Sequence, residues 1–227
     1  MIIFGKQVVL HLLKHYPSYI LEFYLVKEID KKTFSLLQAH QQEYHSALLR
    51  VDFKKAQAMA RGGNHQGWLA KVLPPKPSTL SVLKSLDKLL VLCGLSDVGN
   101  VGALFRSVAC LGFDGIVMDK SLPFEGLART SMGALYEVPF CICSNPADIL
   151  QTFKDVRVHC YGAHTEGQDV KEVNFKIPLA IFLGSEGAGL ASKLVRRMDT
   201  LVHIGMKGKI DSLNVSVAGA ILMDRAR

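Results

Sequence analysis

Six short apolar runs alternate with helical segments over residues 88–204, and this alternation constrains the fold more than any other feature of the chain. The runs indicate strands at residues 88–94, 115–118, 138–143, 156–162, 178–184 and 200–204. Continuous apolar strands separated by helices are typical of a parallel sheet covered on both faces. We therefore predict an α/β fold with a mostly parallel sheet, whose ligand site lies beyond the carboxyl ends of its strands.

A proline-rich segment separates this region from the first part of the chain. Residues 73–78 hold three of the eight prolines, whose fixed φ and missing N–H exclude helix and strand interiors. Before them, the patterns indicate helices at residues 7–14 and 31–43, strands at 20–26, 48–51 and 68–72, and a further helix before the last strand. The sequence thus predicts a small α/β domain over residues 1–72, a linker over 73–85 and a larger domain over 86–227.

Basic residues are concentrated in the first predicted domain. The chain carries 27 Lys and Arg against 20 Asp and Glu, a formal net charge of +7, and residues 1–72 alone hold 10 basic and 5 acidic residues. Such a surface favours an anionic partner, with a merely solvated basic face as the alternative.

The cysteines and the lengths of the apolar runs indicate a cytoplasmic protein. The cysteines are odd in number, lie mostly in apolar runs and include no CxxC pair; they are Cys93, Cys110, Cys141, Cys143 and Cys160. We interpret them as buried thiols in a reducing compartment and expect no metal site. The apolar runs are far shorter than a membrane span, and the N-terminus lacks the pattern of a signal peptide, so we expect no membrane partner.

Three loops that follow predicted strands combine glycine with polar side chains. The first covers residues 95–107, where Asn100 is a candidate helix cap, and Gly102 and Arg106 share one helix face. The Arg106 side chain would lean over the gap left by Gly102 toward the start of the helix, where a guanidinium suits a phosphate. The alternative is a structural cap beside a surface arginine.

The second loop, residues 183–190, is dense in glycine, and the third, residues 205–218, is basic and leads into a helix. The glycines of the second loop do not fit GxGxxG, and the chain contains no P-loop signature, so neither nucleotide-binding motif is favoured. Glu186 places a carboxylate in the second loop, whereas Ser212 and Asn214 are residue types that cap helices. Small residues on the last helix would let another backbone approach closely. Each loop alone could be a structural turn or a capped helix.

Together and in this order, the three loops resemble the signature motifs of the SpoU/TrmH family of SPOUT RNA 2′-O-ribose methyltransferases. The matching segments are Asn100-x-Gly102-x-x-x-Arg106-Ser107, Leu183-Gly184-Ser185-Glu186-Gly187 and Ser212-Leu213-Asn214-Val215-Ser216-Val217-Ala218. Residues 4–9 and 65–72 resemble the two ends of the family's N-terminal substrate-binding domain, which is similar to certain RNA-binding ribosomal proteins. The two-domain arrangement is that of members that methylate a guanosine in bacterial 23S ribosomal RNA.

The resemblance implies a C-terminal trefoil knot whose loops bind S-adenosyl-L-methionine. On the family's motifs, the cofactor-binding positions are Leu183, Gly184, Gly187, Ile204, Met206 and Leu213, and the catalytic ones are Arg106, Asn100, Glu186, Ser212 and Asn214. Arg106 would act on the 2′-hydroxyl and the adjacent phosphate, while the other four position RNA and hold the loops. The resemblance also implies a homodimer packed through the last helix and a reaction that requires no metal.

Methylation of 23S ribosomal RNA at a ribose 2′-hydroxyl is therefore the expected function. The same reaction on transfer RNA is one alternative, although family members that modify transfer RNA often lack the N-terminal domain. A non-catalytic RNA-binding or ribosome-assembly factor on the same fold is another, against which the five intact polar residues argue. Two prolines usual in the family are missing, near Val98 and Gly205, and the second loss affects a loop of the implied cofactor pocket.

Overall fold

The computed structural model describes residues 1–208 and 212–227, and the chain divides into two compact units. Unit 1 comprises Met1–Lys76 and Pro123–Tyr136, and unit 2 comprises Pro77–Leu122 and Glu137–Arg227. The domain borders given above stay a prediction, and the grouping of residues 123–136 with unit 1 has no counterpart in it. Lys209, Ile210 and Asp211, which belong to the basic loop predicted before the last helix, lie outside the described residues.

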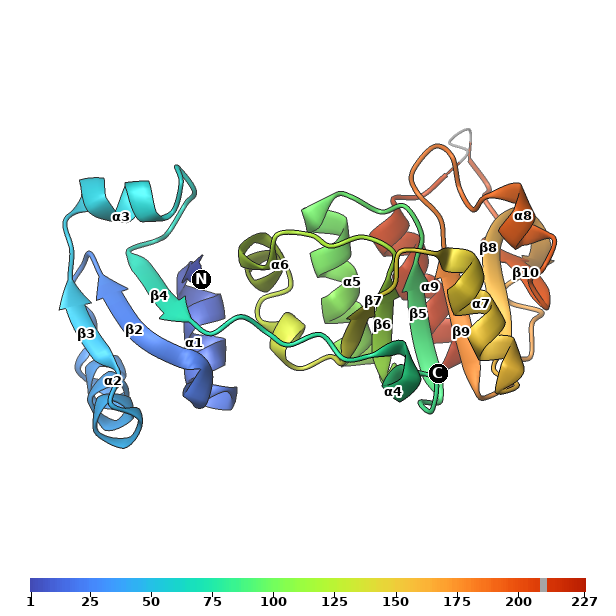
Figure 1. Cartoon of the computed structure of the whole chain (residues 1–227). Coiled ribbons are helices and arrows are strands. Elements are labelled where there is room, and N and C mark those ends of the chain that lie inside the picture. Colours follow the sequence, from blue (N-terminus) through green and yellow to red (C-terminus); the bar gives the residue numbers. More distant parts are fainter. Residues whose placement is uncertain (209–211) are drawn as a thin grey trace. The chain divides into compact units, whose positions relative to one another are not determined.

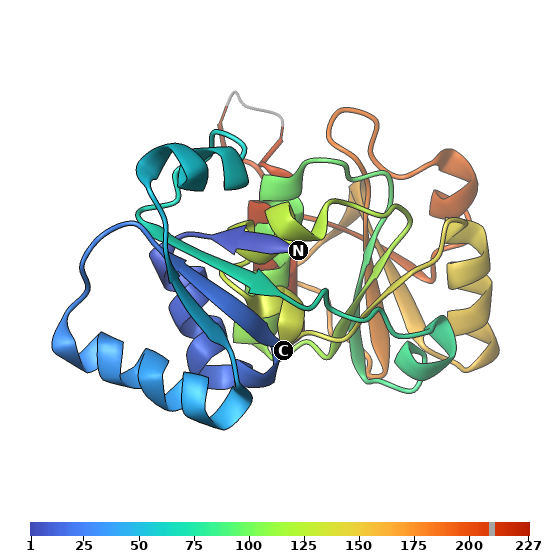
Figure 2. The same cartoon turned by 60° about the vertical axis from the view of Figure 1, so that its left-hand side comes forward.

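Unit 1 is built on a four-stranded sheet in the order β1-β4-β2-β3 (Figures 1 and 2). β4 runs antiparallel to β1 and β2, whereas β2 and β3 are parallel. The strands are β1 (Ile2–Phe4), β2 (Ile20–Leu25), β3 (Ala47–Arg50) and β4 (Trp68–Val72), and the helices are α1 (Lys6–His15), η1 (Pro17–Tyr19), α2 (Lys31–Tyr44) and α3 (Phe53–Met59). The elements predicted with bounds are confirmed to within one residue at each end. The prediction omitted β1, because three residues are too short to show an alternating pattern.

Helix α6 (Phe124–Thr130) and the turn η2 (Ala134–Tyr136) complete unit 1 from a distant part of the sequence. The Arg129 guanidinium lies over the Phe4 ring, 5.4 Å from its centre. Gly133 has φ +95°, and a Cβ there would lie 2.6 Å from His11 Cδ2. This close approach to α1 shows why the segment belongs to unit 1.

Unit 2 contains a six-stranded sheet, parallel throughout, in the order β10-β8-β9-β5-β6-β7 (Figure 1). Its strands are β5 (Lys88–Leu92), β6 (Gly115–Met118), β7 (Phe140–Ile142), β8 (His159–Asp169), β9 (Leu179–Leu183) and β10 (Thr200–His203). Its helices are α4 (Leu80–Leu83), α5 (Val98–Leu111), α7 (Pro146–Asp155), α8 (Ser192–Val195) and α9 (Val215–Ala226). The predicted α/β fold with a mostly parallel sheet is confirmed.

Helices cover both faces of this sheet. One face forms a core with α4, α7 and α8, in which Leu83, Phe153 and Phe182 are fully buried. On the other face α5 packs against α9, and Phe105 of α5 meets Phe140 of β7 edge-on. Successive strand residues such as Leu90 and Val91 are both fully buried because each faces one of these two layers.

β8 differs most from its prediction. The predicted strand covered residues 156–162, but β8 runs from His159 to Asp169 and pairs with β10 through a register shift between Leu201 and Val202. Residues 163–169 are polar and show no apolar alternation, so their sequence gave no sign of a strand. At Gly167 a Cβ would lie 2.4 Å from the backbone nitrogen of Val202, so only glycine allows this approach.

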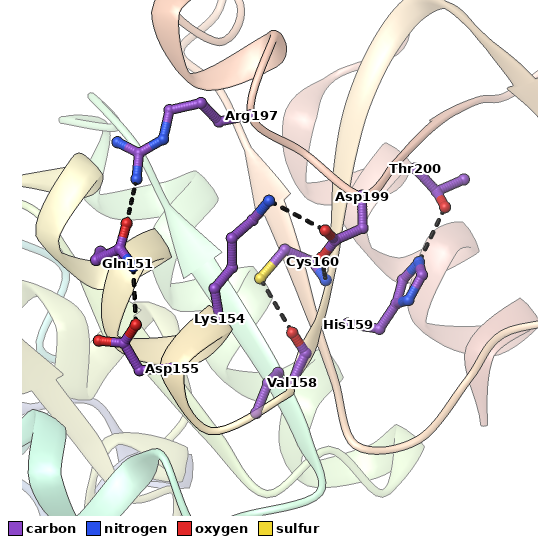
Figure 3. A network of polar contacts seen from close by, with 9 residues as sticks. All are labelled: Gln151, Lys154, Asp155, Val158, His159, Cys160, Arg197, Asp199 and Thr200. Atoms are coloured by element: carbon purple, nitrogen blue, oxygen red, sulfur yellow. Dashed lines mark hydrogen bonds and ion pairs between the residues drawn. The ribbon is translucent and has the colours of Figure 1, made fainter.

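A polar network joins the first residues of β8 and β10 (Figure 3). His159 Nε2 lies 2.9 Å from Thr200 Oγ1, and the Asp199 carboxylate accepts the backbone N–H of Cys160 at 2.8 Å. Lys154 Nζ lies 3.0 Å from the same carboxylate. Burial lowers the pKa of His159, which favours its neutral ring. These contacts fix the amino ends of the two strands and leave their carboxyl ends for the site.

Other features agree with the prediction except for one thiol. Residues 73–79 form neither helix nor strand, as the prolines require. Cys93, Cys141 and Cys160 are buried and Cys143 is partly buried, but Cys110 is exposed, so the interpretation of all five as buried thiols was wrong. Cys110 lies on α5 away from the buried face formed by Val101, Leu104, Phe105 and Val108. No helix in the described part of the chain is long and apolar enough to span a membrane.

Candidate active site

A cavity of about 870 Å³ lies beside the middle of β8 and the carboxyl ends of β9 and β10. Its walls are residues of these strands, the segments that follow β9 and β10, and one side of α9. The six residues predicted to bind the cofactor all line it: Leu183, Gly184, Gly187, Ile204, Met206 and Leu213. Glu186, Ser212 and Asn214 line it as well, so the fold gathers nine of the eleven predicted site residues around one cavity.

The glycine-dense loop after β9 folds back on itself. A Cβ at Gly184 would lie 2.1 Å from the carbonyl carbon of Gly189, so the two backbone segments touch where a side chain would be. Gly189 donates its N–H to the Ser185 carbonyl at 2.9 Å and has φ +64°, and Gly187 has φ +84°. Glycine is needed at these positions for close approach at one and for left-handed backbone at the others.

Asp97, and not Asn100, caps helix α5. The Asp97 carboxylate accepts the backbone N–H of Asn100 at 2.7 Å, and the helix begins at Val98. The predicted capping role of Asn100 was therefore wrong. The helix begins before Asn100, and Asp97 is the residue whose side chain accepts an N–H of its first turn. The Asn100 side chain is free to reach across to another loop.

Asn100, Glu186 and Asn214 form one hydrogen-bonded cluster from three distant segments. Asn100 Nδ2 donates to Glu186 Oε1 at 2.9 Å, and Asn214 Nδ2 donates to Asn100 Oδ1 at 2.9 Å and to Glu186 Oε1 at 3.2 Å. Asn214 also caps α9, since its Oδ1 accepts the Ser216 N–H at 2.9 Å. The cluster therefore links the starts of α5 and α9 to the loop after β9.

Arg106 lies on α5 and is not among the residues that line the cavity. Its side chain is exposed, and no hydrogen-bond or ion-pair partner is found for it within residues 1–208 and 212–227. A guanidinium without a carboxylate neighbour has all its N–H donors available to an external anion. The approach of Arg106 to a bound phosphate stays a prediction.

The cavity also contains residues that sequence reasoning missed. Ala163, His164 and Thr165 of β8 line it, as do Val202 and His203 of β10. Nδ1 of His203 donates to the Gly167 carbonyl at 2.7 Å, which leaves Nε2 of the neutral ring as an acceptor. The strand predicted at residues 200–204 includes His203, but its partner Gly167 lies in the extension of β8, which has no apolar pattern.

The chemistry of the cavity favours an organic ligand with an apolar part. Met206 is 41% exposed and Leu213 is 37% exposed. Two large apolar side chains of the lining are therefore available to contact a ligand. Burial raises the pKa of the Cys93 thiol to about 12, with a contribution from Asp119, so this thiol is no nucleophile near neutral pH. Among the described residues, no three His, Cys, Asp or Glu side chains are grouped to hold a metal ion.

Gly219 of α9 serves packing within the chain. A Cβ at Gly219 would lie 2.5 Å from Leu104 Cδ2 and 2.8 Å from Leu183 Cδ1. The element that closely approaches Gly219 is thus α5, together with β9, of the same chain. This contact holds α9 against the strand that leads into the cavity.

Two family models match the chain. The model of the SpoU rRNA Methylase family covers residues 87–224, and the model for RNA 2′-O ribose methyltransferase substrate binding covers residues 2–78. Together they span both parts of the chain.

Curated relatives match over most or all of the chain. The chain is 31% identical to the 23S rRNA (guanosine-2′-O-)-methyltransferase RlmB of Shewanella oneidensis, over 99% of this chain and 96% of that protein. It is 32% identical to a putative TrmH family tRNA/rRNA methyltransferase of Staphylococcus saprophyticus, over 70% of this chain and 68% of that protein.

Solved structures share the fold at lower identity. An AdoMet-bound rRNA methyltransferase of Sinorhizobium meliloti matches with a TM-score of 0.79 and 22% identity, over 100% of this chain and 86% of that one. The SpoU methyltransferase AviRb of Streptomyces viridochromogenes, in complex with AdoMet, matches with a TM-score of 0.80 and 18% identity, over 100% of this chain and 88% of that one.

Proposed function

The chain belongs to the SpoU rRNA Methylase family, and we propose that it transfers the methyl group of S-adenosyl-L-methionine to a ribose 2′-hydroxyl of 23S ribosomal RNA. The observation that carries this proposal is the hydrogen-bonded cluster of Asn100, Glu186 and Asn214. It joins one residue from each of the three motif loops beside a single cavity. The relative from Shewanella oneidensis, named for this reaction on 23S rRNA, is similar over nearly the whole chain.

The cavity fits S-adenosyl-L-methionine. Its volume of about 870 Å³ suits a ligand of that size, and its walls combine apolar side chains with bent backbone at Gly184 and Gly187. Leu183, Ile204 and Leu213 would contact the apolar part of the cofactor, while backbone groups of the loops after β9 and β10 bind its polar edges. When bound, the cofactor supplies a sulfonium methyl group, which is already activated for transfer.

Arg106 would bind the phosphate next to the target ribose and stabilise the negative charge that develops on the 2′-oxygen. A guanidinium is a hydrogen-bond donor with no acceptor atom, so Arg106 is not assigned the role of base, and the adjacent phosphate or water would accept the hydroxyl proton. Asn100, Glu186, Ser212 and Asn214 would position RNA and hold the loops. Their task is alignment of the hydroxyl oxygen with the methyl carbon and sulfur.

Unit 1 would bring the ribosomal RNA to this site. Its residues 2–78 match the model for RNA 2′-O ribose methyltransferase substrate binding, and residues 1–72 carry twice as many basic as acidic side chains. Transfer RNA is the second candidate substrate, favoured by the tRNA/rRNA name of the Staphylococcus saprophyticus relative.

The family resemblance extends the proposal to the fold and the assembly. We propose that the segment after β10 passes through a loop of unit 2 to form a trefoil knot, and that unit 1 resembles certain RNA-binding ribosomal proteins. We propose a homodimer that packs through α9, on which Val217 is 47% exposed. The relatives are bacterial, and bacterial ribosomes are assembled in the cytoplasm, where this chain would act.

Methyl transfer into RNA tests the proposal. Labelled S-adenosyl-L-methionine is incubated with the protein and unmodified total RNA, and the ribosomal and transfer fractions are then separated and digested to nucleosides. We expect a labelled 2′-O-methylnucleoside in 23S RNA. Label in transfer RNA alone would establish the second candidate, and binding of cofactor and RNA without transfer would favour a non-catalytic role.

A matched pair of arginine variants tests whether Arg106 is needed for methyl transfer. Arg106→Ala should abolish transfer while cofactor affinity stays unchanged, because Arg106 does not line the cavity. Arg196→Ala removes another exposed arginine of unit 2 and should transfer normally. Equal activity of the two variants would contradict the assigned role of Arg106.

A further inference from the structure

The most exposed large apolar side chain of the described residues belongs to Phe53, at 64%. Phe53 is the first residue of α3, which lies at the end of unit 1 opposite α2 in both views (Figures 1 and 2). Ala56 is the residue that anchors this helix in the core, so the Phe53 ring contributes little to burial. A single exposed apolar residue needs no explanation by itself. The residues near Phe53 indicate whether it binds a ligand.

Basic residues lie at the carboxyl ends of β2 and β3, near the start of α3 at Phe53. Lys27 follows β2 and lies over Gly67, where a Cβ would be 3.4 Å from Lys27 Cγ. Arg50 ends β3, and its Nη1 donates to the Lys27 carbonyl at 2.8 Å. Lys54 is the next residue after Phe53, and all three cations are exposed. The nearby Asp52 is occupied as the cap of α3, where it accepts the Lys55 N–H at 2.7 Å.

The buried His65 ring contacts the Phe53 ring at an angle of 52° between the ring planes. The two ring centres are 5.2 Å apart, and His65 is only 4% exposed. Its Nδ1 accepts the Gly67 N–H at 3.0 Å, so the neutral ring carries its proton on Nε2. Nε2 has no hydrogen-bond partner among the described residues, so this buried N–H is unpaired beside the aromatic surface. A ring that already contacts a buried neighbour loses less freedom when a ligand stacks on its exposed face.

We propose that Phe53 is a stacking surface for an unpaired base of the RNA substrate, with Lys27, Arg50 and Lys54 binding the neighbouring phosphates. The inference rests on the proposed function, which supplies RNA as the ligand. Aromatic side chains flanked by cations bind single strands because each base offers a flat face for stacking. A base inside a duplex is already stacked on its neighbours, so the surface selects loops, bulges or single strands.

Binding of two RNA forms to the full-length protein tests the inference without reference to catalysis. The probes are a short single-stranded RNA of mixed sequence and the same sequence annealed as a blunt duplex, measured by fluorescence anisotropy. Phe53→Ala should weaken single-strand binding by about 5- to 150-fold, the range for loss of one base–aromatic stack, and leave duplex binding unchanged. Phe34→Ala is the control, because Phe34 is 38% exposed on α2 at the other end of unit 1.

Two further variants separate stacking from a structural role. Phe53→Leu keeps an apolar cover over His65 but no flat face, and it should bind single strands as weakly as Phe53→Ala. Phe53→Trp should bind at least as well as the wild type, with its fluorescence quenched by the stacked base. Thermal unfolding of each variant shows whether the fold is retained.

The outcomes distinguish this inference from the proposed function. Single-strand binding by Phe53→Ala equal to the wild type, equal losses for both RNA forms, full binding by Phe53→Leu, or no single-strand binding by the wild type would each overturn it. If the wild type binds single strands through Phe53 but transfers no methyl group, the inference stands and the proposed function fails. If methyl transfer occurs, Phe53→Ala should raise the KM for RNA and leave kcat unchanged.

Discussion

Replacement of Gly184 by alanine tests the geometry on which the candidate site depends. Gly184 follows β9 directly, and a Cβ there would lie 2.1 Å from the Gly189 carbonyl carbon and 2.3 Å from both the Gly189 oxygen and the Leu190 nitrogen. Ordinary contacts begin at 3.4 Å, so the backbone of Gly189 and Leu190 would have to move. Leu190 is only 5% exposed and belongs to the core, so this movement reaches beyond the loop.

The cost follows from these contacts. Overpacking against atoms that cannot move away costs about 1–3 kcal/mol. Loss of the Gly189 N–H bond to Ser185 adds about 1 kcal/mol. Alanine also restricts the unfolded chain, which offsets about 0.4–1 kcal/mol. A net loss of about 2 kcal/mol lowers the Tm of a unit of this size by about 4–8 °C.

Gly187→Ala is the matched control in the same loop. Nothing lies within 4 Å of a Cβ at Gly187, so the only penalty comes from its φ of +84°. That strain costs about 1–2 kcal/mol before the unfolded-state offset, which corresponds to a Tm loss of about 2–4 °C. Calorimetry gives both Tm values, and titration with S-adenosyl-L-methionine should show the larger loss of affinity for Gly184→Ala. Equal Tm values for the two variants would refute the close contact of Gly184 with Gly189.

Three further predictions concern polar and thiol groups. Glu186→Ala should lower kcat/KM for methyl transfer about tenfold through loss of two hydrogen bonds at Oε1, whereas Glu186→Gln keeps an acceptor and should lose less; equal losses would contradict the cluster. In a Cys143→Ser protein, an aromatic disulfide reagent should react rapidly with the exposed Cys110 and not with Cys93, Cys141 or Cys160. Rapid release of more than one equivalent from this variant would contradict the prediction, and Cys110→Ser is the control. Burial raises the pKa of Cys93, Cys141 and Cys160 to about 12 from an ordinary 9.0. Because the unfolded chain loses these protons first, the free energy of unfolding should fall as pH rises above about 9. Urea midpoints that do not change up to pH 10 would contradict this prediction.

The sequence could predict where the site lies because strand ends are visible in it. Apolar runs locate the strands, and in a parallel sheet all carboxyl ends meet at one edge. Leu183 and Ile204 lie at the carboxyl ends of two predicted strands, so their convergence on one cavity follows from the pattern. The start of α9 could not be placed in this way, because Asn214 reaches the site through contacts with Asn100 and Glu186, which are distant in sequence.

The sequence could not indicate which of two similar residues caps helix α5. Asp97 and Asn100 are both good caps, and the pattern alone does not say which one takes the exposed N–H groups of α5. The choice matters for the site, because the Asn100 amide binds Glu186 when Asp97 serves as the cap. Segment 123–136 could not be placed for another reason, since its grouping with unit 1 depends on contacts such as Arg129 with Phe4.

Residue 205, where the family usually has proline, lies close to the end of the extended strand β8. A Cβ at residue 205 would lie 2.9 Å from Asp169 Oδ2, at the last residue of that strand. This carboxylate is held by the Lys171 N–H at 3.0 Å, and the next residue, Val170, donates its N–H to the His203 carbonyl at 2.8 Å. A side chain at 205 would therefore push against the Asp169 carboxylate, which would have to shift. The same strand extension supplies His164 and Thr165 to the cavity, so Gly205 contacts the end of a strand that forms part of the lining.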